Sequence, residues 1–169
     1  MTTYTLSETS PKRCDLAGPE GNIVYKIASP VTPGNSNVTI MRGEELIAVI
    51  HWRWFERSTL TMNGGTTKIG EVFPRPKKMS NSRIYTMPDG YQFKWKGLDR
   101  VYAVNVETGI NVATYYQNKF YLFNKKKSTL DIAAGASTEL TDALVVTWAI
   151  YEKKARDWRR SRWHAHGGG

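Results

Sequence analysis

The sequence contains little of the chemistry that builds catalytic or metal sites. Cys14 is the only cysteine among 169 residues, which excludes an internal disulfide and a thiolate metal cluster. The three histidines are His51, His164 and His166, and the last two lie in a glycine-ended tail typical of disordered or added residues. Arg13 beside Cys14 favours a reactive thiolate, but a lone exposed thiol is usually inert. We therefore expect no catalytic residue, no metal and no cofactor.

Nucleotide-binding and secretion signals are also missing. The sequence has neither a Gly-x-x-x-x-Gly-Lys-Ser/Thr motif nor a Gly-x-Gly-x-x-Gly motif, and its carboxylates are scattered rather than paired. The first 14 residues carry Ser, Thr and Lys where a secretory signal needs an apolar core of about 7 to 15 residues. These absences predict a non-enzymatic, cytoplasmic protein.

No apolar run is long enough to span a bilayer, which takes about 20 residues. The longest run, residues 143–151, is short and contains Thr147. Its β-branched residues favour a strand. Its flanks favour a helix, because Thr138 and Thr141 are candidate N-caps and cations follow the run. Taken as a helix over about 139–157, the segment is apolar all round and should be buried on every side. Its predicted core residues are Leu144, Val145, Val146, Trp148, Ala149 and Ile150.

The rest of the chain reads as short β-prone runs separated by turn signals. A clear example is the segment after Asp89-Gly90, in which Tyr91, Phe93 and Trp95 alternate with polar residues. About twelve such strands are predicted, a number at which antiparallel sheets close into barrels or split into sandwiches. We expect one domain over residues 1–157 and a basic, flexible tail over 158–169.

A dozen strands followed by one buried C-terminal helix resembles the tubby-like fold, which includes tubby C-terminal domains, LURP-one-related proteins and phospholipid scramblases. The chain is most similar to a group of small fungal proteins of unknown function. The residues that carry this resemblance are 21–27, 29–30, 48–52, 89–96, 112–115 and 145–153. The resemblance implies a mainly β fold, a closed antiparallel barrel of about twelve strands around a central hydrophobic helix. It also implies phosphoinositide binding through basic surface residues, as in tubby domains.

The net charge of +9 favours an anionic partner. Each cation near an anionic leaflet contributes about 1 kcal/mol, so a few that converge can hold a protein at a membrane surface. The candidate residues for binding anionic lipid fall in three clusters: Arg75, Lys77 and Lys78; Lys125, Lys126 and Lys127; and Lys153, Lys154, Arg156, Arg159 and Arg160. We expect a monomer that binds anionic phospholipid head groups and is peripheral at a membrane.

Three other interpretations of the cations stay open. The clusters are also typical of solvated loop ends, and the domain could be a protein-interaction or structural module without a lipid role. Single-stranded nucleic acid is a weaker alternative, because Trp52 and Trp54 flank Arg53 in the manner of a stacking platform. In a strand Trp52 and Trp54 share one face, so packing of both rings against the protein is the simpler expectation.

Overall fold

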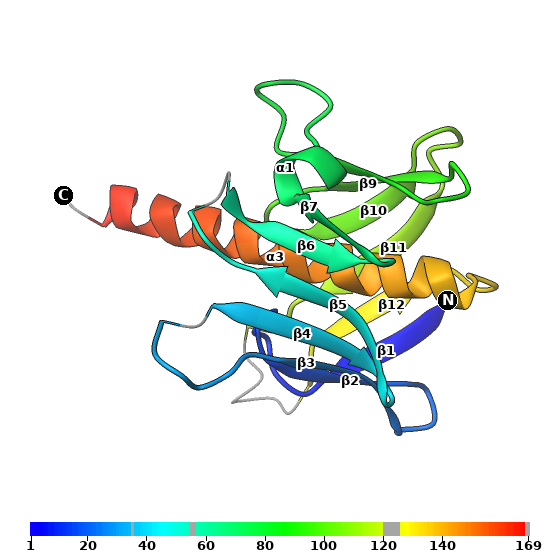
Figure 1. Cartoon of the computed structure of the whole chain (residues 1–169). Coiled ribbons are helices and arrows are strands. Elements are labelled where there is room, and N and C mark those ends of the chain that lie inside the picture. The colour runs from blue at the N-terminus through cyan, green and yellow to red at the C-terminus, as the bar shows by residue number, and fades with distance from the viewer. Residues whose placement is uncertain (35, 55–56, 120–125, 168–169) are drawn as a thin grey trace.

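The computed structural model describes residues 1–34, 36–54, 57–119 and 126–167, which form a mainly β fold with a C-terminal helix (Figure 1). The prediction of about twelve antiparallel strands is confirmed. The strands are β1 (Thr2–Leu6), β2 (Cys14–Ala17), β3 (Ile23–Ala28), β4 (Asn37–Arg42), β5 (Glu45–His51), β6 (Thr59–Met62), β7 (Gly65–Lys68), β8 (Arg83–Thr86), β9 (Gln92–Lys96), β10 (Val101–Asn105), β11 (Asn111–Tyr116) and β12 (Thr129–Ile132). The helices are α1 (Ile69–Val72), which no sequence pattern indicated, and α3 (Thr138–His166).

The twelve strands of the described residues belong to one sheet, in the order β7-β6-β5-β4-β3-β2-β1-β12-β11-β10-β9-β8. Most strands pair with their neighbours along the chain, and β1 pairs with β12, which joins the two halves of the sheet. Tight turns make this order possible. In the β6–β7 turn, Asn63 and Gly64 both have positive φ, 54° and 76°, as a two-residue hairpin of this kind requires.

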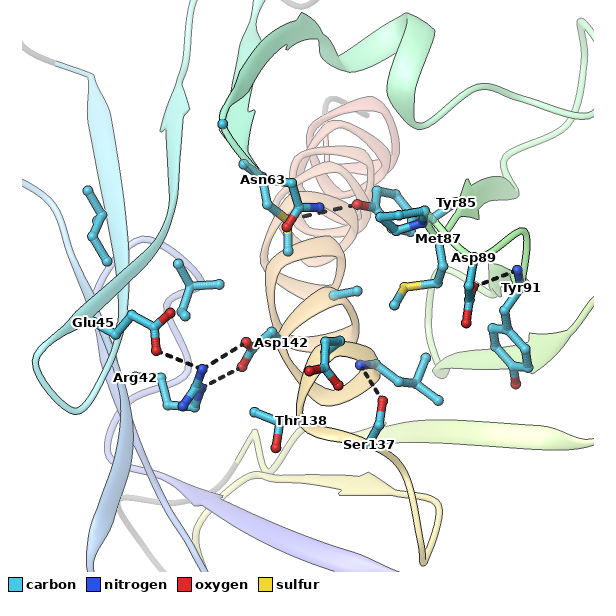
Figure 2. A pocket seen from close by; sticks show the side chains of 18 residues that line it. Arg42, Glu45, Asn63, Tyr85, Met87, Asp89, Tyr91, Ser137, Thr138 and Asp142 are labelled. Carbon is cyan, nitrogen blue, oxygen red and sulfur yellow. Dashed lines mark hydrogen bonds and ion pairs between the residues drawn. The ribbon is translucent and has the colours of Figure 1, made fainter.

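The predicted closure of the sheet into a barrel is not observed, because no pairing joins β7 to β8 in the part of the chain that the structure describes. After β7 the chain turns into α1, and the segment that follows takes the place of a partner strand. The Ile84 amide of β8 donates to the Pro74 carbonyl at 2.9 Å, and the Arg83 guanidinium donates to the Phe73 carbonyl at 2.9 Å. Elsewhere along this gap, the Tyr85 hydroxyl faces the Met62 sulfur at 3.9 Å (Figure 2).

The sheet curls around α3, which runs through the middle of the fold (Figure 1). Every residue from Thr141 to Glu152 is buried, so the helix is enclosed on all its faces over this stretch. Leu144, Val145, Val146, Trp148, Ala149 and Ile150 are each at most 1% exposed. The strands supply the facing half of the core through alternate side chains, as at Phe93 and Trp95 of β9.

Both ends of α3 differ from the sequence prediction. Ser137, rather than Thr138 or Thr141, is the N-cap, and its Oγ accepts a hydrogen bond from the Leu140 amide at 3.1 Å. The helix also continues past the predicted end at residue 157 to His166, so the residues predicted as a flexible tail are helical there. Residues 158–166 contain no proline or glycine that would stop the helix, and Gly167 follows them as C-cap.

A buried hydrogen-bond chain fixes the helix against the sheet. The Trp95 indole Nε1 donates to Thr147 Oγ1 at 2.8 Å, and that hydroxyl donates to the Ala143 carbonyl of the preceding turn at 2.6 Å. Thr147 is fully buried, so water cannot replace it as a partner for the indole. A buried donor without an acceptor costs about 1–3 kcal/mol, which makes Thr147 a specific requirement of this core.

Thr147→Val should therefore lower the free energy of unfolding by about 1–3 kcal/mol, because valine keeps the shape and leaves the Trp95 indole unpaired. Thr3→Val, the same change at an exposed position of β1, should shift it by less than about 0.5 kcal/mol. Urea denaturation followed by tryptophan fluorescence measures both. Equal effects of the two substitutions would show that the buried hydrogen bond contributes nothing.

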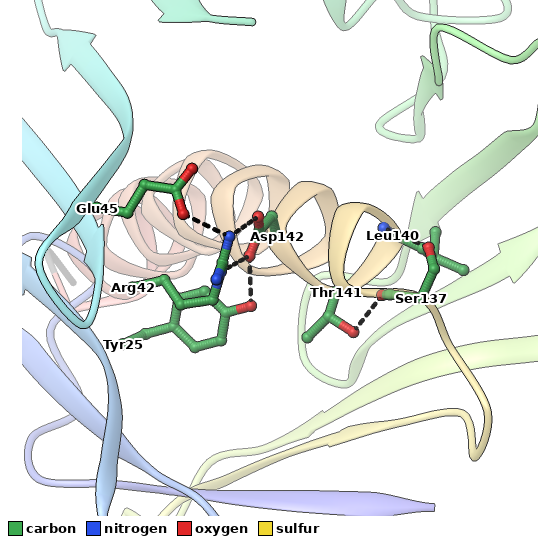
Figure 3. Close-up of polar contacts among 7 residues, drawn as sticks. All are labelled: Tyr25, Arg42, Glu45, Ser137, Leu140, Thr141 and Asp142. Carbon is green, nitrogen blue, oxygen red and sulfur yellow. Dashed lines mark hydrogen bonds and ion pairs between the residues drawn. The ribbon is translucent and has the colours of Figure 1, made fainter.

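A second polar contact ties the first turns of α3 to β3 and β4 (Figure 3). The Tyr25 hydroxyl donates to Asp142 Oδ1 at 2.6 Å, and Arg42 Nε donates to the same oxygen at 3.0 Å. Arg42 Nη2 also reaches Glu45 at 2.9 Å. Burial, and then the hydrogen bond to Asp142, raises the pKa of Tyr25, so its hydroxyl stays protonated and remains a donor.

A double-mutant cycle of Tyr25→Phe and Asp142→Ala should give a coupling energy of about 1–3 kcal/mol, since the two groups share a buried hydrogen bond. Tyr85→Phe combined with Asp142→Ala serves as the control pair, because the Tyr85 hydroxyl contacts Met62 instead. Chemical denaturation of the single and double variants supplies the four free energies. Additive effects in the Tyr25 pair would contradict the proposed tether.

Candidate anion-binding surface

The strand order gives the molecule two distinct ends. Because neighbouring strands are antiparallel, every connection from an odd to an even strand lies at one end, and every connection from an even to an odd strand lies at the other. α3 follows β12, so it begins at the second end and emerges at the first. We call the end with the odd-to-even connections, where α3 emerges, the basic end. It is formed by α3 after Tyr151 and by the described residues of loops 7–13, 29–36, 52–58, 69–82, 97–100 and 117–128. We call the end with the even-to-odd connections, where α3 begins, the acidic end. It is formed by the first turns of α3, by loops 18–22, 43–44, 63–64, 87–91, 106–110 and 133–137, and by the strand residues that border these loops.

Charge separates between these two ends. Among the described residues, the basic end carries many cations against the acids Glu8, Glu71, Asp99, Glu152 and Asp157. These cations are Lys12, Arg13, Arg53, Arg57, Arg75, Lys77, Lys78, Arg100, Lys119, Lys126, Lys127, Lys153, Lys154, Arg156, Arg159, Arg160 and Arg162. The described acidic end carries Glu20, Glu44, Glu45, Asp89, Glu107, Glu139 and Asp142, with Arg42 as its one Lys or Arg side chain. A contact with a large anion is therefore favoured at the basic end.

The first two clusters lie at the basic end but not side by side. Arg75, Lys77 and Lys78 are exposed in the loop before β8. Lys126 and Lys127 are exposed in the loop before β12, and Lys125 lies outside the described residues. Because β9 and β10 stand between β8 and β11 in the sheet, the two loops do not form one continuous cluster on their own.

The third cluster is largely engaged in holding α3. Arg156 Nη1 donates to the Thr9 carbonyl at 3.2 Å, and Arg159 Nη2 pairs with the buried Glu152 at 2.5 Å. Burial raises the pKa of Glu152, and the Arg159 guanidinium opposes that rise. Lys153 is half-buried and pairs with Asp157 at 2.6 Å, Lys154 is half-buried, and Arg160 is exposed. Arg156 and Arg159 therefore bond mainly to other residues of the protein, whereas Arg160 faces solvent.

A hollow of about 1130 Å³ at the basic end was not anticipated from the sequence. Arg53, Arg57 and Lys153 line it, together with His51 and Trp54. Arginines are well suited to phosphate because the guanidinium presents a planar fork of donors. Arg53 follows Trp52 in the sequence, but that stretch was interpreted as packing, so neither Arg53 nor Arg57 was among the predicted binding residues.

The prediction that Trp52 and Trp54 both pack against the protein is wrong for Trp54. Trp52 is 6% exposed and lies under Lys153, whose Nζ is 4.9 Å from its ring centroid. Trp54 is 88% exposed. β5 ends at His51, so the alternation of a strand does not extend to Trp54. The exposed ring lines the hollow beside the two arginines.

A smaller pocket of about 250 Å³ brings distant members of the predicted clusters together. Arg75 from the loop before β8 and Lys154 of α3 both line it, with Trp158 as an aromatic wall. Asp157 lines both this pocket and the larger hollow. The two cavities are therefore neighbours around the emerging helix, and Arg75 of the first cluster meets Lys154 of the third in the smaller one.

The structure also bears on metal binding, on Cys14 and on membrane-spanning helices. No group of three His, Cys, Asp or Glu side chains among the described residues could hold a metal ion. Cys14 is 2% exposed instead of solvent-accessible, and burial raises the pKa of its thiol to about 12. Neither described helix has the length and apolar character needed to cross a bilayer.

Comparison with known proteins identifies a family. A sequence model described as a family of unknown function, DUF6593, matches residues 9–157. The chain belongs to this DUF6593 family. A search of curated proteins returned no match. An X-ray structure of a protein from Arabidopsis thaliana is similar in fold, with a TM-score of 0.50 at 10% sequence identity, over 92% of this chain and 91% of that chain.

The span of the DUF6593 match bears on the candidate surface. It contains Arg53, Arg57, Trp54 and Lys153, which line the larger hollow. It ends before the last turns of α3, where Arg160 and the 82%-exposed Trp163 lie. The hollow is therefore built from the part of this DUF6593 chain that the family model matches, and the last turns of α3 lie outside the match.

Cys14 gives a direct check on the buried N-terminal strands. Because the thiol is buried and its pKa is raised to about 12, iodoacetamide should alkylate it in the native protein at pH 8 at least about 100-fold more slowly than in urea. Mass spectrometry of quenched time points measures both rates. Rapid labelling of the native protein would show that β2 is not packed as described.

Proposed function

We propose that this protein is a non-enzymatic domain that binds anionic phospholipid head groups through its basic end. The observation that carries the proposal is the hollow lined by Arg53 and Arg57, with the exposed ring of Trp54 on its wall. Lys153 also lines it but pairs with Asp157. The hollow lies at the end of the molecule where the cations gather. A phosphorylated head group fits this combination of guanidinium donors and concave space.

The surrounding cations add a less specific attraction. Lys77, Lys78, Lys126 and Lys127 are exposed on loops at the same end, and each contributes about 1 kcal/mol near an anionic leaflet. The exposed rings of Trp54 and Trp163 suit the interface between head groups and acyl chains. A protein held in this way is peripheral, and in the cytoplasm it would face the anionic leaflet.

The tubby-like resemblance supports the same ligand class but remains part of the proposal. A single hydrophobic helix within a twelve-stranded antiparallel sheet is the arrangement that the resemblance implies, apart from the gap between β7 and β8. Tubby domains bind phosphoinositides through basic surface residues. For this chain we propose the ligand class alone, with Arg53 and Arg57 as its principal contacts.

One observation favours a second candidate, single-stranded nucleic acid. The 88%-exposed Trp54 beside Arg53 and Arg57 could stack on a base while the arginines contact phosphates. The two candidates differ in the role of the ring. Base stacking is worth about 1–3 kcal/mol per base, so Trp54→Ala should abolish most nucleic-acid binding but only weaken lipid binding.

An acidic protein partner would bind at the same end without requiring either vesicles or nucleic acid.

Arg53→Gln combined with Arg57→Gln should lower the affinity for vesicles containing phosphatidylserine and phosphatidylinositol bisphosphate about 30-fold, since two contacts of about 1 kcal/mol are lost. Lys26→Gln combined with Lys94→Gln is the matched control, because it removes the same charge from the middle of β3 and β9. Vesicle sedimentation at low salt, with phosphatidylcholine vesicles for comparison, measures both.

Binding to the anionic vesicles no stronger than to phosphatidylcholine would refute the proposal. Equal losses in the two double variants would also refute it, by showing that net charge alone controls the association. A parallel titration with oligo(dT) separates the candidates: binding to oligo(dT) that Trp54→Ala removes, without vesicle binding, would favour nucleic acid.

A further inference from the structure

The acidic end contains a cavity of about 650 Å³ that neither the charge of the chain nor the family match explains (Figure 2). Its walls come from the first turns of α3, the adjoining ends of β4 and β5, the β6–β7 turn with the end of β6, and β8 with the turn that follows it. The cavity lies where the sheet is not closed, since the β6–β7 hairpin is on one side of it and β8 is on the other. The gap between the sheet edges therefore gives access to the start of the central helix.

The surface of this cavity is apolar and polar in nearly equal parts. Met62 at the end of β6 and Met87 just after β8 belong to its apolar part, and so do Ile47, Tyr91 and Leu140. Methionine side chains adapt to ligands of different shape, and a cavity of this volume lies in the range of small-molecule sites. The lining suits the apolar body of a ligand.

The charge of the lining is negative. Glu45, Asp89, Glu139 and Asp142 line the cavity, and among the described residues Arg42 is the only Lys or Arg that lines it. Arg42 is already engaged, with Nε 3.0 Å from Asp142 and Nη2 2.9 Å from Glu45. An anionic ligand would therefore meet carboxylates without an available cation, whereas a cationic one would be attracted by Asp89 and Glu139.

The N-terminus of α3 would by itself favour an anion, but its effect is smaller. A helix dipole contributes about 0.3–1 kcal/mol at an exposed terminus and is already opposed by Glu139 in the first turn. The Ser137 side chain accepts from the Leu140 amide at 3.1 Å, so this donor is satisfied within the helix. The carboxylates therefore determine that the favoured ligand carries a positive charge.

We propose that this cavity binds a small organic ammonium ion, with the apolar body among Met62, Met87 and Leu140 and the ammonium group near Asp89 and Glu139. The site lies at the opposite end of the molecule from the proposed lipid surface and shares no residue with it. The two proposals are therefore independent, and either can fail without the other.

Isothermal titration calorimetry with three probes of equal chain length tests the site: octylammonium, octanol and octanoate. Octylammonium should bind about 10-fold more tightly than octanol, and octanoate should not bind in the same concentration range. Leu46→Trp should reduce octylammonium binding at least about 10-fold by filling the cavity, since Leu46 lines it and is 54% exposed. Ile110→Trp is the matched control at an exposed site of the same end outside the cavity.

A second pair of variants tests the charge. Asp89→Asn with Glu139→Gln should weaken octylammonium binding about 3- to 10-fold and leave octanol binding unchanged, because exposed charge pairs contribute up to about 1 kcal/mol each. Asparagine keeps the oxygen that accepts from the Tyr91 amide. Glu20→Gln with Glu107→Gln removes the same charge from the same end outside the cavity and should have little effect.

The proposal would be overturned if octanol bound as tightly as octylammonium. It would also be overturned if the Leu46→Trp variant bound octylammonium as tightly as the unchanged protein does. Equal losses in the two charge variants would also overturn it. The Arg53→Gln and Arg57→Gln variant should bind octylammonium as well as the unchanged protein does. A loss there would place the ligand at the basic end instead.

Discussion

An α-helix that is apolar on every side cannot be covered by one face of a flat sheet, and this constraint governs the whole fold. Residues from Thr141 to Glu152 are buried all round, so strands must lie on every side of them. Twelve short antiparallel strands in nearly sequential order meet the requirement. The polar groups on the enclosed stretch are then constrained as well, and Thr147 and Asp142 each bond to a side chain of the sheet.

The central helix also makes the molecule directional. Its start lies at the end where carboxylates gather, and its last turns lie at the end where cations gather, which agrees with the sign of the helix dipole at both. The sheet gap between β7 and β8 has different consequences at the two ends. At the basic end it is bridged by Phe73 and Pro74, which bond to β8, and at the acidic end it opens into the cavity beside Met62 and Met87.

The sequence predicted those features of the structure that follow from the pattern of apolar and polar residues along a single strand or helix. The alternation at Phe93 and Trp95 and the all-round apolar helix both have counterparts in the fold. The sequence could not predict contacts between distant residues. Sheet closure fails because α1 follows β7, the hollow combines Arg53 with Lys153, and Asp142 meets Arg42 from far along the chain. Trp54 was misassigned because the end of β5 at His51 left no sequence signal.

The central claim is that the basic end faces the membrane and the acidic end faces water. Its most direct test places a spin label on one of two cysteine variants: Met79→Cys, in the loop before β8 at the basic end, or Ile110→Cys, in the β10–β11 turn at the acidic end. Both positions are exposed. The native Cys14 is buried and should stay unlabelled. Accessibility to a water-soluble paramagnetic reagent is then compared with and without anionic vesicles. Our account predicts that vesicles protect the label at position 79 and leave the label at position 110 unchanged. Protection at position 110, or equal protection at both positions, would contradict it.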